Sequence, residues 1–204
     1  MRVFLASGNA KKIGEMQRIL AEHVPGIEVL GIADVDGYVE PVEDQPTFEG
    51  NALLKARAGV AATGLPSVAD DSGLCVDALN GMPGVLSARW SGPPKSDQRN
   101  NELLLAQLDD VPDERRGAHF ACAVAWVMPD GRERVVEGRM DGRIIREVRG
   151  SGGFGYDVVF VAVEHDAEDL TSAELEPGEK DRISHRGRAL RALAPQVAAD
   201  LSGD

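Results

Sequence analysis

The first twenty residues constrain the fold most, because the spacing of their apolar residues changes from that of a strand to that of a helix across a single tight turn. The run "RVFLAS" is rich in β-branched and aromatic residues and predicts a buried strand. After Ser-Gly-Asn, "AKKIGEMQRILAEH" spaces its apolar residues at helical intervals, with Asn9 placed to cap the helix. A strand joined to a helix in this way is a building unit of α/β domains.

The same alternation continues along the chain. Further strands are predicted at "IEVLGI", at "PSVAD" and "LCVDAL" on either side of an Asp-Ser-Gly bend, and at "VVFVAV". Further helices are predicted from Thr47 to Ala62 with Gly64 at the end, from Ser96 to Leu108, and at the C-terminus. "AHFACAVAWVMPDGRERVVEGRM" predicts a hairpin that turns at Asp130-Gly131. We therefore expect a single α/β domain over residues 1–204, with a central mixed β-sheet flanked by helices.

Charge and cysteine usage exclude several classes of function. The formal net charge of -12 repels polyanions, so nonspecific binding to nucleic acid or to an anionic membrane is not expected. Cys75 and Cys122 lie in apolar surroundings without metal-ligand spacing, which predicts buried thiols in a reduced compartment. No signal-peptide or membrane-helix pattern is present, and a cytoplasmic protein is expected.

Two stretches could bind phosphate and metal. "SGNAKK" combines a hydroxyl, an amide, a lysine and a helix N-terminus, which suits an anion, although a capped helix with a solvated lysine explains it equally well. "ADDSG" is either an acidic turn or a site for a hard cation, since a cation relieves the repulsion between adjacent carboxylates.

Three more stretches carry candidate side chains. In "VEDQPTFEGNALLKA", Asn51 and Lys55 lie one helical turn apart and can reach a common point, or they belong to an ordinary polar helix face. In "GGFGYD", glycines allow close approach to a ligand and Phe154 could stack on a flat ring; the alternative is a bulge or hairpin corner. His185 and Arg186 lie in a basic segment, residues 179–191, and offer adjacent donors to a carbonyl or phosphate oxygen. The alternatives are a solvated helix face for the segment and a helix-capping role for His185.

Taken in order, these motifs resemble the inosine triphosphate pyrophosphatase family, which hydrolyses non-standard purine nucleoside triphosphates such as ITP, dITP and XTP. The resemblance is carried by "SGNAKK", "TFEGNALLKA", "ADDSGL", "GVLSARWSG", "GGFGYD" and "ISHRGRAL", which cover nearly the whole chain. It implies cleavage between the α and β phosphates with Mg²⁺, an active-site cleft between two lobes, and a homodimer.

The resemblance also implies roles for individual residues. Asp71 is the expected proton acceptor and metal ligand, Glu43 the second metal ligand, and Lys55 a further catalytic residue that contacts phosphate. The expected phosphate contacts are Ser7, Gly8, Asn9, Ala10, Lys11, Lys12 and Ser72. The expected contacts to the purine and ribose are Phe154, Gly155, Tyr156, Asp157, Lys180, His185 and Arg186. Asp70 is expected to be a supporting carboxylate.

Base recognition should depend on the purine 6-position. Inosine and xanthosine present an oxygen acceptor there, whereas adenosine presents an amino donor, so a donor such as Arg186 discriminates between them by about 10³ to 10⁴. Guanine shares the 6-oxygen, so a contact near its 2-amino group must exclude GTP.

Two positions depart from the family pattern. Gly50 stands where many relatives have a glutamate, with Glu49 a possible substitute, and Val158 stands where proline is common. Two rival functions remain: a nucleotide-sensing module without turnover, and a pyrophosphatase that acts on pyrimidine or modified nucleotides. The presence of Asp71, Glu43 and Lys55 together favours an enzyme over a sensor.

Overall fold

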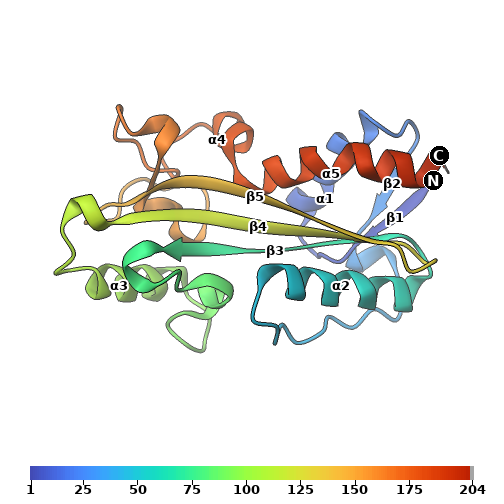
Figure 1. The fold of residues 1–204 in the computed structure, drawn as a ribbon, viewed down its shortest axis with the longest axis horizontal. Helices are drawn as coiled ribbons and strands as arrows, with labels where there is room; N and C mark the ends of the chain where they lie inside the picture. The colour runs from blue at the N-terminus through green and yellow to red at the C-terminus, as the bar shows by residue number, and fades with distance from the viewer. Residues whose placement is uncertain (203–204) are drawn as a thin grey trace. The chain divides into compact units, whose positions relative to one another are not determined.

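The computed structural model describes residues 1–202 and has an α/β fold on a six-stranded mixed sheet, with strand order β2-β1-β3-β4-β5-β6 (Figure 1). The strands are β1 (Arg2–Leu5), β2 (Glu28–Leu30), β3 (Ser67–Val76), β4 (Gly117–Val127), β5 (Glu133–Ile144) and β6 (Phe160–Ala162). The α-helices are α1 (Ala10–Ala21), α2 (Phe48–Thr63), α3 (Asp97–Gln107), α4 (Pro177–Ile183) and α5 (His185–Ser202). β1 is parallel to β2 and β3, whereas β5 and β6 are antiparallel, so the predicted fold class is confirmed.

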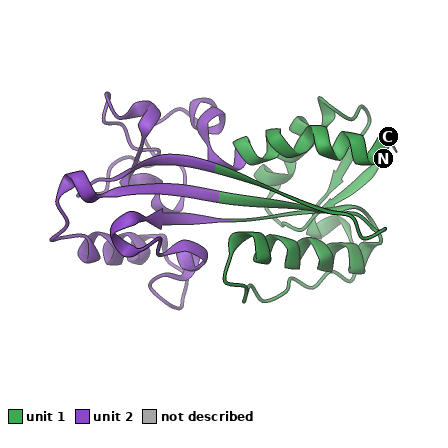
Figure 2. Cartoon of the chain, viewed as in Figure 1, with its two compact units in different colours: residues 1–71, 122–138, 188–204 green, residues 72–121, 139–187 purple. Residues whose placement is uncertain are grey.

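The chain divides into two compact units (Figure 2). Unit 1 contains residues 1–71, residues 122–138 and the C-terminal residues from Arg188 on. Unit 2 contains residues 72–121 and 139–187. The division in β3 falls between the second aspartate and the serine of "ADDSG".

In unit 1 the sheet is buried on both faces, as Figure 1 shows with α2 on one side of the strands and α5 on the other. Val3 and Leu5 of β1 belong to the core formed with α1 and α5. Phe4 between them belongs to the core formed with Ala52 and Ala56 of α2. This follows from the period of two along a strand, which turns successive side chains to opposite faces.

Unit 2 has its own core. Leu74 of β3, Phe120 of β4 and Met140 of β5 pack with Leu104 of α3, and Tyr156 completes the group. All five side chains are less than a tenth exposed. Each unit therefore has a close-packed apolar core of its own.

The predicted helix boundaries are confirmed by their caps. Asn9, Thr47 and Ser96 each accept a hydrogen bond from a backbone N–H group in the first turn of the helix that follows. Gly64 ends α2 in the left-handed conformation, with φ of 67°. The predicted hairpin is also present, and Gly131 at its turn has φ of 91°.

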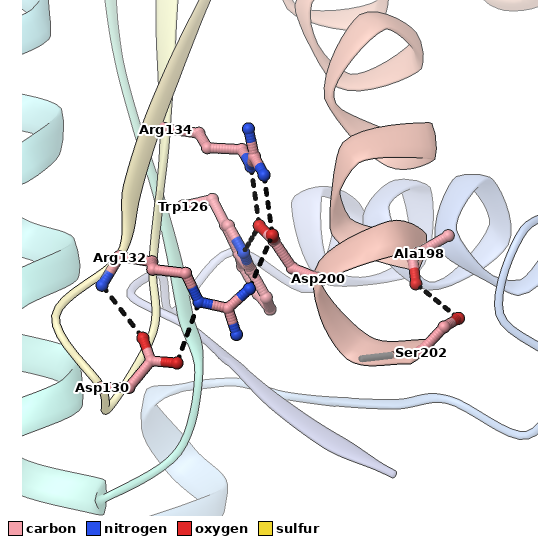
Figure 3. Close-up of polar contacts among 7 residues, drawn as sticks. All are labelled: Trp126, Asp130, Arg132, Arg134, Ala198, Asp200 and Ser202. Carbon is pink, nitrogen blue, oxygen red and sulfur yellow. Dashed lines mark hydrogen bonds and ion pairs between the residues drawn. The ribbon is translucent and has the colours of Figure 1, made fainter. Parts of the chain in front are cut away.

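The C-terminal helix α5 is attached to the β4–β5 hairpin through Asp200 (Figure 3). This buried carboxylate accepts hydrogen bonds from Arg134 Nε and Nη2, both at 2.7 Å, from Arg132 Nη1 at 3.0 Å and from Trp126 Nε1 at 3.1 Å. The hydrogen bonds from Arg134, followed by the nearby charges, hold the pKa of Asp200 below its usual value.

One prediction about the strands is wrong. The two short strands expected around an Asp-Ser-Gly bend are a single strand, β3, which continues through "ADDSG". Gly73 lies in extended backbone and does not have the positive φ of a glycine turn. Asp70 and Asp71 are tolerated inside the strand because lysine side chains lie close to both carboxylates.

Smaller differences concern the ends of elements. Only Glu28–Leu30 of "IEVLGI" is strand, and Val158 and Val159 of "VVFVAV" belong to the 3₁₀ helix Gly155–Val159. Helix α4 was not predicted separately, and Ser184 in extended backbone divides it from α5. Both cysteines are buried and unbridged, as predicted. Within residues 1–202, no helix has the length and apolar character to cross a membrane.

Candidate active site

Three carboxylates and two lysines gather in unit 1, and we call them the carboxylate–lysine cluster. Its members are Glu43, Asp70, Asp71, Lys12 and Lys55. Asp70 and Asp71 come from β3, Lys12 from α1, Lys55 from α2, and Glu43 from the irregular segment before α2. Groups of opposite charge therefore lie in close contact on three elements of this unit.

Lys55 lies at the centre of this cluster. Its buried Nζ donates to Glu43 Oε1 at 2.6 Å and lies 3.9 Å from Asp71 Oδ1. Burial disfavours the ammonium, but the hydrogen bond to Glu43 and the charges of Asp71, Glu43 and Asp70 outweigh it and raise the pKa of Lys55. The lysine therefore stays positively charged at neutral pH.

Asn51, one turn before Lys55 on α2, orients Asp71. Its side chain is fully buried, and its Nδ2 donates to Asp71 Oδ2 at 2.9 Å. Its Oδ1 accepts from the backbone N–H of Gln45 at 3.0 Å, two residues after Glu43. The predicted convergence of Asn51 and Lys55 is thus confirmed, and Asp71 is the common point. The sequence pairs Asn51 with Lys55 by helical spacing but assigns it no role, and the structure shows that it contacts Asp71.

"SGNAKK" forms the start of α1. Ser7 Oγ accepts from the backbone N–H of Asn9 at 3.2 Å, and Asn9 Oδ1 accepts from that of Lys11 at 3.0 Å. Lys12 Nζ lies 2.7 Å from Asp70 Oδ2, so this side chain is an ion-pair partner and not a freely solvated lysine. Gly8, Asn9, Ala10 and Lys11 are exposed, where an anion can approach them.

The structure also explains the glycine at position 50. A Cβ on Gly50 would lie 2.8 Å from the Cβ of Gln45, whose backbone is held by Asn51. Glu49 is exposed on the first turn of α2 and makes no hydrogen bond or ion pair within the described part of the chain. Gly50 is therefore explained by packing, and no contact supports Glu49 as a substitute carboxylate.

In unit 2, residues 153–157 present an exposed aromatic ring. Phe154 is 68% exposed, and Lys180 Nζ lies 5.2 Å from the centre of its ring. Lys180 forms an ion pair with the buried carboxylate of Asp157, which also accepts from Phe154 N at 2.8 Å. A side chain at position 153 would collide with Asp157, and φ of 71° there also requires glycine.

The other predicted residues of unit 2 lie in different surroundings. Tyr156 is buried in the core, where its hydroxyl donates to the Ser87 carbonyl at 2.9 Å and burial raises its pKa. Its side chain therefore anchors the segment. His185 stacks on Phe120, with ring centres 5.0 Å apart and planes 11° apart. Arg186 follows it at the start of α5, and Ser72 follows Asp71 in β3, both half-buried.

Comparison with known proteins agrees with the motifs. Residues 3–196 match the model of the Ham1 family. The chain is 57% identical over 207 residues to a dITP/XTP pyrophosphatase of Corynebacterium efficiens, covering 100% of both chains. It is 60% identical over 199 residues to a dITP/XTP pyrophosphatase of Nocardia farcinica, covering 97% of this chain and 95% of that one.

Solved structures give the same result. A crystal structure of a nucleoside-triphosphatase, named a dITP/XTP pyrophosphatase, from Mycobacterium abscessus is 56% identical, with a TM-score of 0.81 and coverage of 96% of this chain and 100% of that one. A HAM1 protein from Coxiella burnetii is 36% identical, with a TM-score of 0.87 and coverage of 100% of both chains. The resemblance inferred from the motifs is confirmed, and the chain belongs to the Ham1 family.

Proposed function

We propose that this protein hydrolyses ITP, dITP and XTP between the α and β phosphates, releasing a nucleoside monophosphate and pyrophosphate. It would thereby remove these nucleotides from the cellular pool. The observation that carries the proposal is the carboxylate–lysine cluster, in which Asn51 orients Asp71 and Lys55 is held charged beside it. The names of relatives at 57% and 60% identity support the same reaction. We propose that the whole chain acts as one pyrophosphatase domain, since the family model spans residues 3–196.

Mg²⁺ fits this cluster by the chemistry of its donors. Within residues 1–202 there is no group of three or more His, Cys, Asp or Glu side chains arranged around a metal position. Mg²⁺ commonly takes only one or two carboxylates and completes its shell with water and substrate phosphates. Glu43 and Asp71 would supply those carboxylates, since both already lie around one cationic group, the Lys55 ammonium. When bound, the ion would neutralise negative charge on the phosphoryl oxygens.

The protein's own residues then have distinct tasks. Asp71, which accepts a hydrogen bond from Asn51, would orient a water molecule and accept its proton. Lys55 and Lys12 contribute positive charge to a triphosphate that carries about four negative charges. The exposed start of α1, from Ser7 to Lys12, offers backbone N–H groups to phosphate, and Ser72 offers a hydroxyl.

Base selection is assigned to unit 2. The exposed Phe154 ring would stack on the purine, and Lys180, His185 and Arg186 would supply donors on the base and ribose side. A donor that faces the 6-oxygen of hypoxanthine would face another donor in adenine. A buried donor left unpaired is costly, so ATP should be disfavoured.

Product analysis of the catalysed reaction tests the proposal. ITP incubated with Mg²⁺ should give IMP and pyrophosphate in equal amounts, without free phosphate. Asp71→Asn should abolish turnover while ITP binding, followed by calorimetry, stays measurable. Release of phosphate from the γ position, or normal turnover by the variant, would overturn the proposed reaction or the role of Asp71, respectively.

We also propose a cytoplasmic homodimer. The two buried, unbridged cysteines suit a reducing compartment, and the family resemblance favours a dimer. Sedimentation velocity of the purified protein should give a single species of twice the chain mass. A monomer at micromolar concentration would contradict the dimer.

A further inference from the structure

We propose that Asp97 and Asn101 of α3 are positioning residues that hold Phe154 as a preformed stacking platform for the purine. The inference rests on the proposed function and deepens it, because it assigns to α3 a part in base recognition.

The contacts converge on Gly155, the neighbour of Phe154. The backbone N–H of Gly155 donates to Asp97 Oδ2 at 2.7 Å, and its carbonyl accepts from Asn101 Nδ2 at 2.9 Å. Asp97 and Asn101 lie one turn apart on α3, so their side chains extend from the same face of the helix. Both polar backbone groups of Gly155 are therefore held by one helix.

Asp157 fixes the backbone of Phe154 itself. Its Oδ2 accepts from the backbone N–H of Phe154 at 2.8 Å and pairs with Lys180, which lies over the Phe154 ring. The backbone is thus fixed on both sides of a side chain that is itself 68% exposed.

Packing alone does not explain this arrangement. Burial of Tyr156 accounts for order on one side of Gly155, but Phe154 on the other side belongs to none of the hydrophobic cores, so burial of its ring does not account for its fixed backbone. Asn101 is only 3% exposed, yet its Oδ1 has no hydrogen-bond partner within the described residues. Burying an unsatisfied amide oxygen is unfavourable, and an apolar side chain would avoid it at this core position. The bond from Asn101 to Gly155 gives a reason for asparagine here.

A fixed ring binds a base better than a mobile one. Stacking on a mobile side chain loses conformational entropy on binding, and a ring whose backbone is already ordered loses less. The benefit applies equally to the ground state and the transition state, so it should alter KM more than kcat.

A double-mutant cycle tests the inference. In the wild-type background, Asp97→Ala and Asn101→Ala should each raise KM for ITP by about fivefold, with kcat changed by less than about twofold. Phe154→Ala should raise KM by about tenfold or more. In the Phe154→Ala background, Asp97→Ala should raise KM no further, because the ring through which Asp97 acts is gone.

Two controls separate this role from general stability. Asp97→Asn keeps an oxygen acceptor for Gly155 N–H and should keep KM within about twofold of wild type. Gln98→Ala, at an exposed neighbouring position of α3, should leave KM unchanged. Asp97 is itself exposed, so its variants should fold even if Asn101→Ala does not.

The outcomes distinguish the inference from the proposed function. An equal rise in KM from Asp97→Ala with and without Phe154 would overturn the positioning role while leaving the enzyme activity intact. Failure of the wild-type protein to release pyrophosphate from ITP would overturn the function. In that case the Kd for ITP would be measured for each variant of the cycle. Additive effects of Asp97→Ala and Phe154→Ala on this Kd would overturn the inference as well.

Discussion

At the scale of single residues, Lys55 is a buried cation held by ion pairs. Its ammonium is buried among three carboxylates that raise its pKa, so it must be protonated for the cluster to hold together. Lys55→Met should lower kcat/KM for ITP by about 10² to 10³, because a cationic group is lost from beside the proposed phosphate site. Pyrophosphate release, with circular dichroism to verify folding, measures the effect.

Arg57→Met on the same helix is the matched control for this prediction. Arg57 pairs with Glu133 at 2.6 Å in an exposed ion pair, and such pairs contribute little to stability. Its activity should stay within about twofold of wild type. An equal loss of activity in both variants would show that charge removal anywhere on α2 suffices, and Lys55 would lose its special role.

The two tyrosines allow a prediction about alkaline pH. Burial, followed by the charges of Glu40 and Glu43, raises the pKa of Tyr38 to about 12, and burial also raises that of Tyr156. A raised folded pKa means that stability is fully present below the unfolded value of about 10 and is lost as pH rises through the folded value. Because the chain has only two tyrosines, native protein at about pH 11 should show almost no phenolate absorbance.

The same titration in concentrated urea is the control, since both tyrosines should then ionise near pH 10. Ionisation of either tyrosine at that pH in the native protein would contradict its burial.

Some residue-level contacts could be predicted from the sequence and others could not. Asn51 and Lys55 lie four residues apart on one helix, so helical geometry alone brings them together. Lys12 and Asp70 are separated by 58 positions, and Asp97 and Gly155 by another 58. Such contacts depend on how distant elements pack, and no local pattern in the sequence reports them.

At the scale of elements, local signals located α1, α2 and α3 but did not separate α4 from α5, and they failed in β3. Caps and glycine ends act within one turn, so Asn9, Thr47 and Gly64 predicted the boundaries of α1 and α2. "ADDSG" has turn-forming residues, and by local preference it should bend. It remains strand because lysines from α1 and α2 lie close to the two aspartates, and that support comes from tertiary structure.

The attachment of α5 gives a prediction for an element. Asp200→Asn should lower the free energy of unfolding by about 2 kcal/mol at pH 7, because a buried carboxylate that accepts four hydrogen bonds loses its charge. The pKa of Asp200 is lowered, so its contribution is present above the unfolded value of about 3.9 and is lost as pH falls through the folded value. Urea unfolding at several pH values should show the gap between the two proteins closing in acid.

Ser202→Ala in the last turn of the same helix is the control. Ser202 Oγ donates to the Ala198 carbonyl at 2.8 Å in an exposed position, so its loss should cost less than about 0.5 kcal/mol (Figure 3). Equal destabilisation by both substitutions would mean that the end of α5 is sensitive to any change and that Asp200 is not its anchor.

At the scale of the whole molecule, the alternation of elements predicted the α/β class and the mixed sheet. It did not predict the strand order, in which β1 lies between β2 and β3, because strand neighbours are set by pairings between distant segments. The alternation of elements did not predict the two units either, because β3, β4 and β5 each contribute to both units and no linker separates them. Two lobes were expected only from the family resemblance.

The measurement that tests the central claim most directly is pyrophosphate release with Mg²⁺ from ITP, XTP, GTP, ATP and dTTP, assayed in parallel. We predict rapid turnover of ITP and XTP, with kcat/KM for ATP lower than for ITP by about 10³ or more. Equal rates on ATP and ITP would contradict recognition of the purine 6-oxygen and, with it, the role assigned to this protein.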